Sequence, residues 1–469
     1  MLRTLVVMSI LVPGFFLALQ DRFKALLLYL WFAFFRPQDW MWLDISALKP
    51  SLLLGLVLVV PSLFSGTMPD VSHPLSIGAL MFLGSAIAAQ ANAVNAQMGL
   101  DWIDFLTRLL LVCLLATTIV NTPRRLAAAF AVVSGSFGFH AAKAGLASLM
   151  GGGVRFFDGL SGAFVDNNGY ACGTVMIMPL LITAGDNLGL LGFAATKPVV
   201  LTWLRRAFRI AVPLCAITVV STYSRGGFLA LATAGLVYIA LHQKRVRLAL
   251  SLSAVVVLIL LFVPLPDGYA DRLETIQTYE DVGDDSAISR THFWQVAMKM
   301  AEDQPLGIGL RNFEFAYDKY DFSHGRYGSH RAVHSSHFQV LAEMGYPGIL
   351  VWFGEFMMAI VVALRVRARS WTPGLSGEHA RFLVSVANCT LASMFGFLVG
   401  GSFLGLALND VTWLTFALLA SADRISAHLV EEVGRTPIAT AATSPASPVA
   451  WTPAPAMTTP VRASWRYSE

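Results

Sequence analysis

The sequence AVHSSHFQ, residues 332–339, ends a long polar island that covers roughly Asp267 to His337. Two apolar stretches, Leu248–Val263 and Phe338–Leu364, enclose the island. Five of the ten histidines of the chain lie inside it: His292, His324, His330, His334 and His337. A polar insert of this length is uncommon in a compact protein unless it is functional or has structure of its own. We therefore expect the chemistry of the protein to reside in this segment.

The composition indicates a membrane protein built from apolar helices. Of the 469 residues, 56% are hydrophobic and only 13% are charged, and the mean hydropathy is +0.63. Soluble domains carry about 25% charged residues, so half of that fraction is typical of membrane proteins. The continuous Leu, Val, Ala and Ile runs lack the alternating pattern of a transmembrane barrel. Helices are then the remaining structure that can carry a backbone across a membrane.

Thirteen apolar segments follow one another, and most are close to the roughly 20 residues that a transmembrane helix needs. They cover residues 3–19, 23–35, 48–64, 74–91, 102–120, 126–149, 168–185, 207–222, 226–241, 246–264, 338–364, 381–400 and 403–422. The segment 23–35 is short for a full span and could be re-entrant. We therefore expect an all-α polytopic membrane protein with about 12–13 transmembrane helices and one large loop. The first segment lacks a signal-peptide cleavage pattern, so we interpret it as a retained span.

Lys and Arg in the connecting loops set the expected orientation, because cytoplasmic loops are enriched in these residues. Basic residues concentrate in the loops 121–125, 197–209, 242–247 and 365–381. The alternate loops, 92–101 and 150–167, contain a single basic residue, Arg155. With the basic loops in the cytoplasm, the loop 150–167, the turn 221–227 and the polar island should share the opposite face.

This orientation divides the chain into four parts. We expect an N-terminal helix bundle over 1–264, an outer catalytic loop over 265–337, the last transmembrane helices over 338–431, and a disordered cytoplasmic tail over 432–469. Within the loop, residues 287–301 have apolar residues at helical spacing. Asp285 and Ser286 are its expected N-terminal cap, and residues 304–309 should end it.

The cysteines show no paired spacing and lie in or beside apolar runs. We expect them to be free and buried, packing as small apolar side chains. They are Cys113, Cys172, Cys215 and Cys389.

Three arginines are candidates for binding phosphate, because the guanidinium fork matches phosphate oxygens. Arg225 lies in YSRGG, residues 223–227, where the glycines permit close approach of a ligand to the backbone. The simpler interpretation is an arginine that reaches from the membrane to its interface. Arg290 and Arg311 lie in the island, where surface ion pairs with the many acidic residues are the alternative. Arginines that meet at the outer surface would suit a lipid-linked pyrophosphate.

His334 is the candidate general base. A histidine with a near-neutral pKa can accept a proton from an attacking hydroxyl group, although a histidine in a loop is often a surface residue without a role. His334 and His337 are spaced i to i+3 and could instead be two metal ligands on one helical face. Acidic residues between 280 and 285 could supply a third ligand. We favour the base over the metal site.

Four motifs together resemble the O-antigen ligase and polymerase superfamily, bacterial membrane enzymes that transfer undecaprenyl-pyrophosphate-linked glycans to an acceptor. The motifs are YSRGG at 223–227, Asp285-Ser286 with Arg290 and Trp294, PLGIG at 305–309, and His334-Ser335 leading to Glu343, Gly345 and Gly348. The resemblance covers about residues 163–364. The N-terminal stretch WFAFFRPQD, residues 31–39, is similar to a narrower branch, the O-glycosylation ligases associated with the exosortase system.

The resemblance implies a glycosyltransferase in which Arg225 and Arg290 hold the pyrophosphate and His334 activates the acceptor hydroxyl group. It implies transfer without a metal or other cofactor, and displacement from one face of the anomeric carbon predicts inversion there. The candidate substrate-binding residues are Arg155, Asn167, Asn168, Asp285, Arg311 and His337. The expected partners are the lipid-linked glycan, a protein or lipid acceptor and the bilayer, with no nucleic acid. The expected site is the periplasmic face of the bacterial inner membrane.

Three alternatives stay open. A polymerase of the same superfamily would take a second lipid-linked glycan as its acceptor, and another ligase would act on the lipid A core. A glycan or ion transporter would also have many apolar helices, but usually places charged residues or broken helices at the midplane of two repeated halves. Glu355 and Asp410 lie within or close to apolar runs and have no role in the ligase interpretation.

Overall fold

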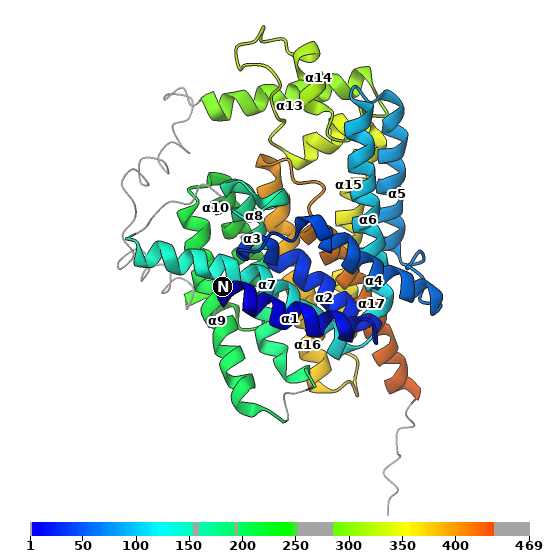
Figure 1. Cartoon of the computed structure of the whole chain (residues 1–469), viewed down its shortest axis with the longest axis vertical. Coiled ribbons are helices and arrows are strands. Elements are labelled where there is room, and N and C mark those ends of the chain that lie inside the picture. The colour runs from blue at the N-terminus through cyan, green and yellow to red at the C-terminus, as the bar shows by residue number, and fades with distance from the viewer. Residues whose placement is uncertain (1, 153–158, 193–195, 248, 251–284, 436–469) are drawn as a thin grey trace, which may run out of the picture.

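The computed structural model describes residues 2–152, 159–192, 196–247, 249–250 and 285–435 (Figure 1). This part of the chain is all helical. Six of its helices are long and apolar enough to cross a membrane. They are α5 (Pro74–Ala89), α6 (Ala96–Ile119), α7 (Pro123–Met150), α8 (Asn167–Asn187), α15 (Ser336–Arg369) and α16 (Gly377–Gly400). The prediction of an all-α polytopic membrane protein is confirmed.

The remaining described helices are shorter or carry more charge. Three short ones are apolar: α1 (Leu2–Ala18), α4 (Pro50–Phe64) and α10 (Arg225–Leu241). The others are α2 (Arg22–Phe35), α3 (Pro37–Trp40), α9 (Pro198–Ser221), α13 (Asp285–Asp303), α14 (Phe313–Tyr320) and α17 (Asp410–Arg435). Each apolar segment predicted up to residue 241 therefore corresponds to a helix, as do the three after residue 337. The segment 246–264 lies almost entirely outside the described residues.

The last predicted segment, 403–422, begins and ends later than expected. The chain leaves helix α16 at Gly400, and α17 begins at Asp410, where the Asn409 side chain accepts a hydrogen bond from the Thr412 amide at 2.9 Å. Because the chain stays apolar across this break, hydropathy could not locate it. Helix α17 continues to Arg435, so the expected tail loses its first residues to the helix. The rest of the tail lies outside the described residues.

Capping side chains determine where many of these helices begin. A polar side chain at the N-cap accepts a hydrogen bond from a first-turn amide that has no partner within the helix. The residues that do so include Asn95, Thr122, Asp166, Ser224, Ser335 and Ser376. The helices then pack around one large cluster of buried apolar side chains. All four cysteines are free and buried, as predicted.

The described part of the polar island, residues 285–337, has a small core of its own. Phe293 and Met300 of α13 pack with Phe313 and Tyr317 of α14, and Figure 1 shows these two helices at the upper end of the molecule. The helix predicted over 287–301 is confirmed. It begins at Asp285, so the residues predicted as its cap lie in its first turn.

Helix α15 is broken at Gly345, and the motif at 305–309 occupies the break. Gly345 has φ 64° and ψ −162°, which interrupts the helical ladder. The Ala342 and Glu343 carbonyls accept hydrogen bonds from the Ile308 and Gly309 amides at 3.1 and 3.0 Å, and the Tyr346 amide donates to the Pro305 carbonyl at 2.9 Å. The polar groups freed by the break are thus satisfied. The island is fixed to the membrane helix through backbone hydrogen bonds.

We expect Gly307→Ala to destabilise the protein strongly. Gly307 has φ +92°, and an added Cβ would lie 2.5 Å from the Glu343 carbonyl oxygen. The left-handed conformation alone costs a non-glycine residue about 1–2 kcal/mol, and the clash adds to that cost. Gly325→Ala is the matched control, because Gly325 has φ +83° and open space around it. Thermal unfolding in detergent should show a large loss for the first variant and a small one for the second. Equal losses would contradict the docking role of the motif.

Candidate active site

The turn that carries Arg225 is stabilised by a capping hydrogen bond and by close packing against α8. The Ser224 hydroxyl accepts a hydrogen bond from the Gly227 amide at 3.0 Å and caps α10. A Cβ at position 227 would lie 2.6 Å from the Cβ of Ala171 on α8. Glycine at this position therefore lets α10 approach α8 closely. Arg225 is the first residue of α10, directly after the capping serine.

Phe403 links the Arg225 turn to Arg290. A Cβ at Gly226 would lie 3.1 Å from the Phe403 side chain, so the turn packs against this ring. The guanidinium carbon of Arg290, on α13, lies 5.8 Å from the centroid of the same ring. An aromatic face at this distance attracts a cation. Phe403 thus lies against both the turn that carries Arg225 and Arg290, which come from segments more than 60 residues apart in the sequence.

His334 lies near α13, with its ring centroid 6.1 Å from that of Phe293. Burial lowers the pKa of the His334 imidazole below its usual 6.5, and the charges of Arg290 and Arg331 lower it further. The Asp166 carboxylate has the opposite, smaller effect. His334 has φ 48°, a left-handed conformation that costs a non-glycine residue of order 1–3 kcal/mol and is concentrated at functional sites. The result is a neutral imidazole that is close to a predicted phosphate-binding arginine.

The loop before α8 reaches the same place through Asp166 and Asn167. Asp166 caps α8 by accepting hydrogen bonds from the Asn168 and Gly169 amides. The Asn167 side chain donates to the Thr222 carbonyl at 2.8 Å, which ties α8 to the turn before Arg225. Asn168 donates to the Asn167 side chain at 3.2 Å. The structure therefore brings the three predicted outer segments together, as far as they are described.

The basic loops gather at the other ends of these helices. The Arg367 guanidinium donates to the Leu241 carbonyl at 3.1 Å and to the Asn388 side chain at 3.0 Å. Because α10 begins at the candidate site and ends at Leu241, these contacts lie at the opposite end of the bundle. The segregation of basic and non-basic loops that the sequence predicts is present in the fold.

His337 differs from the expectation that it binds substrate. Its Nδ1 accepts a hydrogen bond from the Trp352 indole at 3.0 Å, and its Nε2 donates to the Leu398 carbonyl at 3.0 Å. Its ring also stacks on Phe353. Both ring nitrogens are thus occupied, one by Trp352 within α15 and the other by Leu398 on α16. The alternative in which His334 and His337 share a metal ion gains no support, since His337 has no lone pair left for it.

Among the described residues, no group of three His, Cys, Asp or Glu side chains is arranged to hold a metal ion. The acidic residues proposed as a third ligand, between 280 and 285, lie outside those residues, apart from Asp285, whose side chain the structure does not describe.

Arg311 lies in a different setting from Arg225 and Arg290. Its guanidinium carbon is 4.3 Å from the centroid of the Trp102 ring on α6. The buried Glu343 carboxylate accepts a hydrogen bond from the Gln339 side chain at 3.1 Å, and the Arg311 and Phe313 amides are close enough to act on that carboxylate. These contacts favour a role in holding α14 against α15 over the predicted role in substrate binding. Arg155 and the side chain of Asp285 lie outside what the structure describes.

Two residues near the site were not predicted. Phe403 lies in an apolar run. The sequence there does not distinguish an aromatic residue that contacts an arginine from an ordinary core residue. Arg331 contributes to the field at His334, and its position three residues before the histidine is a signal that could have been used.

Comparison with family models identifies the region that contains this site. Residues 210–353 match the O-antigen ligase family. The match includes Arg225, Arg290 and His334, and the members of that family are membrane enzymes that use lipid-linked glycan donors. Residues 2–183 match a family of unknown function, DUF5935. No curated protein matched the chain. The resemblance to O-antigen ligases is thereby confirmed for the region that carries the candidate site.

Proposed function

We propose that the protein is a membrane glycan ligase that transfers a glycan from undecaprenyl pyrophosphate to an acceptor hydroxyl group. The observation that carries this proposal is that the Arg225 turn and Arg290 both contact Phe403, while His334 is close enough to Arg290 for that charge to lower the histidine pKa. All three predicted catalytic residues lie within the O-antigen ligase match. Two guanidinium groups and one neutral imidazole are the groups that such a transfer requires.

In the proposed reaction, the acceptor oxygen forms a bond to the anomeric carbon as its proton passes to His334. The bond from that carbon to the pyrophosphate oxygen breaks, and its electron pair leaves with the carrier. Arg225 and Arg290 stabilise the negative charge that grows on the pyrophosphate, and stabilisation of this kind often contributes more to catalysis than any other effect. The proton on His334 then returns to water. Attack opposite the leaving group gives inversion.

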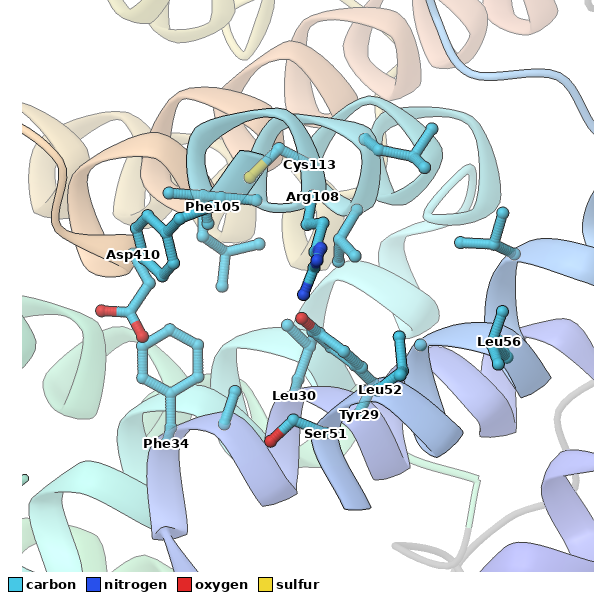
Figure 2. Close-up of a pocket in the computed structure, with 17 residues that line it drawn as sticks. Tyr29, Leu30, Phe34, Ser51, Leu52, Leu56, Phe105, Arg108, Cys113 and Asp410 are labelled. Carbon is cyan, nitrogen blue, oxygen red and sulfur yellow. The ribbon is translucent and has the colours of Figure 1, made fainter. Parts of the chain in front are cut away.

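An apolar cavity between α2, α4, α6 and α17 is a candidate for the polyprenyl tail. It has a volume of about 360 Å³ and is lined mainly by Leu, Val and Phe side chains. Figure 2 shows Asp410 at one end of it, with Tyr29 and Arg108 facing each other across it. Asp410 lies 3.8 Å from the Arg36 guanidinium, which also donates to Ser161 in the outer loop at 3.0 Å. The cavity thus reaches the end of the bundle where Asp166 lies.

The orientation gives a direct prediction. A reporter that is active only in the periplasm should be active when fused near Tyr320 and silent when fused after Arg247, because the second position follows a strongly basic loop. The reverse pattern would place His334 on the cytoplasmic side, away from the periplasmic donor.

The environment of His334 predicts the pH dependence of transfer. Burial and the neighbouring arginines lower its pKa below 6.5, so the base is neutral at pH 7 and becomes protonated only at lower pH. The transfer rate should therefore be level near neutrality and fall on the acid side below pH 6.5. Arg331→Gln removes a positive charge, raises the His334 pKa and should move this acid limb to higher pH. Lys299→Gln, at an exposed position on α13, is the control. If the pH at which the transfer rate falls is unchanged in Arg331→Gln, the assignment of His334 as the base is contradicted.

For the acceptor, we propose a hydroxyl group of an exported protein. The support is the likeness of residues 31–39 to the exosortase-associated O-glycosylation ligases, together with the position of Arg36 beside the outer loop. A polymerase and a ligase of lipid A core are the alternatives within the same family. Mass analysis of exported proteins, lipopolysaccharide and glycan chain length in a deletion strain separates the three. Loss of protein-linked glycan alone is the expected result.

A further inference from the structure

A second cavity lies at the end of the bundle opposite the candidate active site. It has a volume of about 560 Å³ and is formed by the ends of α8, α10 and α15 and the start of α16. Its floor contains the buried Asn388 and the half-buried Ser385 and Tyr238. Its rim contains the exposed Lys244 and Arg381. None of these residues takes part in the proposed transfer.

The surroundings of this cavity are cationic. Asp186 is the only acidic residue among the described residues that line it, and the Arg209 guanidinium lies 3.9 Å from its carboxylate. Arg205 and His242 are also close enough to act on that carboxylate. Arg367 lies behind the floor, bonded to Asn388. The single lining carboxylate is therefore outweighed by its neighbours, and Lys244 and Arg381 on the rim leave the cavity with an excess of positive charge.

We propose that this cavity binds the phosphate headgroup of an anionic phospholipid. Three helices long and apolar enough to span the membrane, α8, α15 and α16, have ends at the cavity, which places it at a membrane surface. Basic pockets between transmembrane helices at such surfaces bind anionic headgroups. The Asn388 amide and the Ser385 hydroxyl of the floor already donate to the Leu241 carbonyl and the Thr183 hydroxyl. The two cations of the rim are therefore the groups that we expect to bind the phosphate.

The lining favours a lipid over a free anion. Beside its polar groups, the cavity is lined by Val384, Ala380 and Trp371, and Trp371 is 67% exposed. Tryptophan at the level of the headgroups is typical of membrane interfaces, where its ring contacts the lipid. A free phosphate ion would use the cations and leave this apolar surface in water.

The test measures which lipids the full-length protein retains. The purified chain is released from nanodiscs with equal amounts of phosphatidylglycerol and phosphatidylcholine, and native mass spectrometry counts the lipids that stay bound. The wild type should retain phosphatidylglycerol selectively. The double variant Lys244→Gln/Arg381→Gln should lose about 25-fold of that selectivity, since each cation near an anionic surface contributes about a fivefold factor. Both positions are exposed, so an unchanged thermal midpoint should accompany the loss.

The control is Arg206→Gln/Arg435→Gln, which removes the same charge from exposed positions outside the cavity. It should keep the wild-type selectivity. Equal losses in the two double variants would show a general effect of net charge and overturn the proposal. In lipid-free detergent, inorganic phosphate should leave the thermal midpoint of the wild type unchanged. Stabilisation by phosphate that disappears in Lys244→Gln/Arg381→Gln would assign the cavity to a free anion instead. Neither result depends on transfer activity.

Discussion

Replacing His334 by alanine is expected to abolish glycan transfer while the lipid-linked donor stays bound. The proposed base is lost, and general-base catalysis contributes about 100- to 10,000-fold to such reactions. Donor binding should change little, because Arg225 and Arg290 hold the pyrophosphate. A loss confined to the chemical step is the signature of a missing transition-state interaction. The measurement is single-turnover transfer by the purified protein in detergent with EDTA, together with donor binding.

Two other histidines serve as controls for this variant. His330 has φ 52°, close to the 48° of His334, but it is exposed and pairs with Asp318, so His330→Ala should transfer normally. His337→Ala loses hydrogen bonds to Trp352 and Leu398 and should lower the thermal midpoint more than the turnover of the folded protein. Wild-type turnover by His334→Ala would contradict the assignment. Equal failure of His334→Ala and His337→Ala, with inactivation of the wild type by EDTA, would favour a metal site.

Arg225→Lys and Arg290→Lys should each reduce transfer by roughly 100- to 1000-fold, which is the usual cost of removing one group that stabilises developing charge. Lysine keeps the charge but lacks the planar fork that binds two phosphate oxygens at once. Both variants should still accumulate in the membrane, because lysine preserves a long cationic side chain at each position. Transfer from a defined lipid-linked donor, normalised to folded protein, measures the effect.

Arg326→Lys is the matched control. Arg326 lies in the same polar island as Arg290 and is exposed. Its guanidinium carbon lies 5.4 Å from the centroid of the Tyr327 ring. It should transfer like the wild type. Full activity in both Arg225→Lys and Arg290→Lys would remove the basis for pyrophosphate binding at Phe403.

Much of the fold could be predicted because hydropathy and loop charge follow from the membrane itself. Long apolar runs must be helical in a bilayer, and the basic loops sort to one end. That sorting predicted that Asp166, the Arg225 turn and His334 would share a face, although they are far apart in the sequence. The side of the membrane on which that face lies stays a prediction.

The parts that could not be predicted depend on contacts between distant segments. The break in α15 at Gly345 is invisible to hydropathy, because the amides that satisfy the freed carbonyls come from Ile308 and Gly309. His337 and His334 lie three residues apart, so they have nearly the same sequence neighbours. Only the positions of Trp352 and Leu398 show that both ring nitrogens of His337 are hydrogen-bonded. Phe403 acquires its place beside Arg290 through the folding of the chain between α16 and α17.

The docking of residues 305–309 into broken α15 has a consequence for how related sequences can diverge. Three backbone groups on one side of the joint must match the spacing of three on the other, whereas the 24 residues between Gly309 and His334 are not part of it. Insertions and deletions in that intervening stretch should therefore be tolerated, and changes of length within 305–309 or 342–346 should not. In a set of relatives, the sequences of the two short segments should covary, while the chain that connects them varies in length.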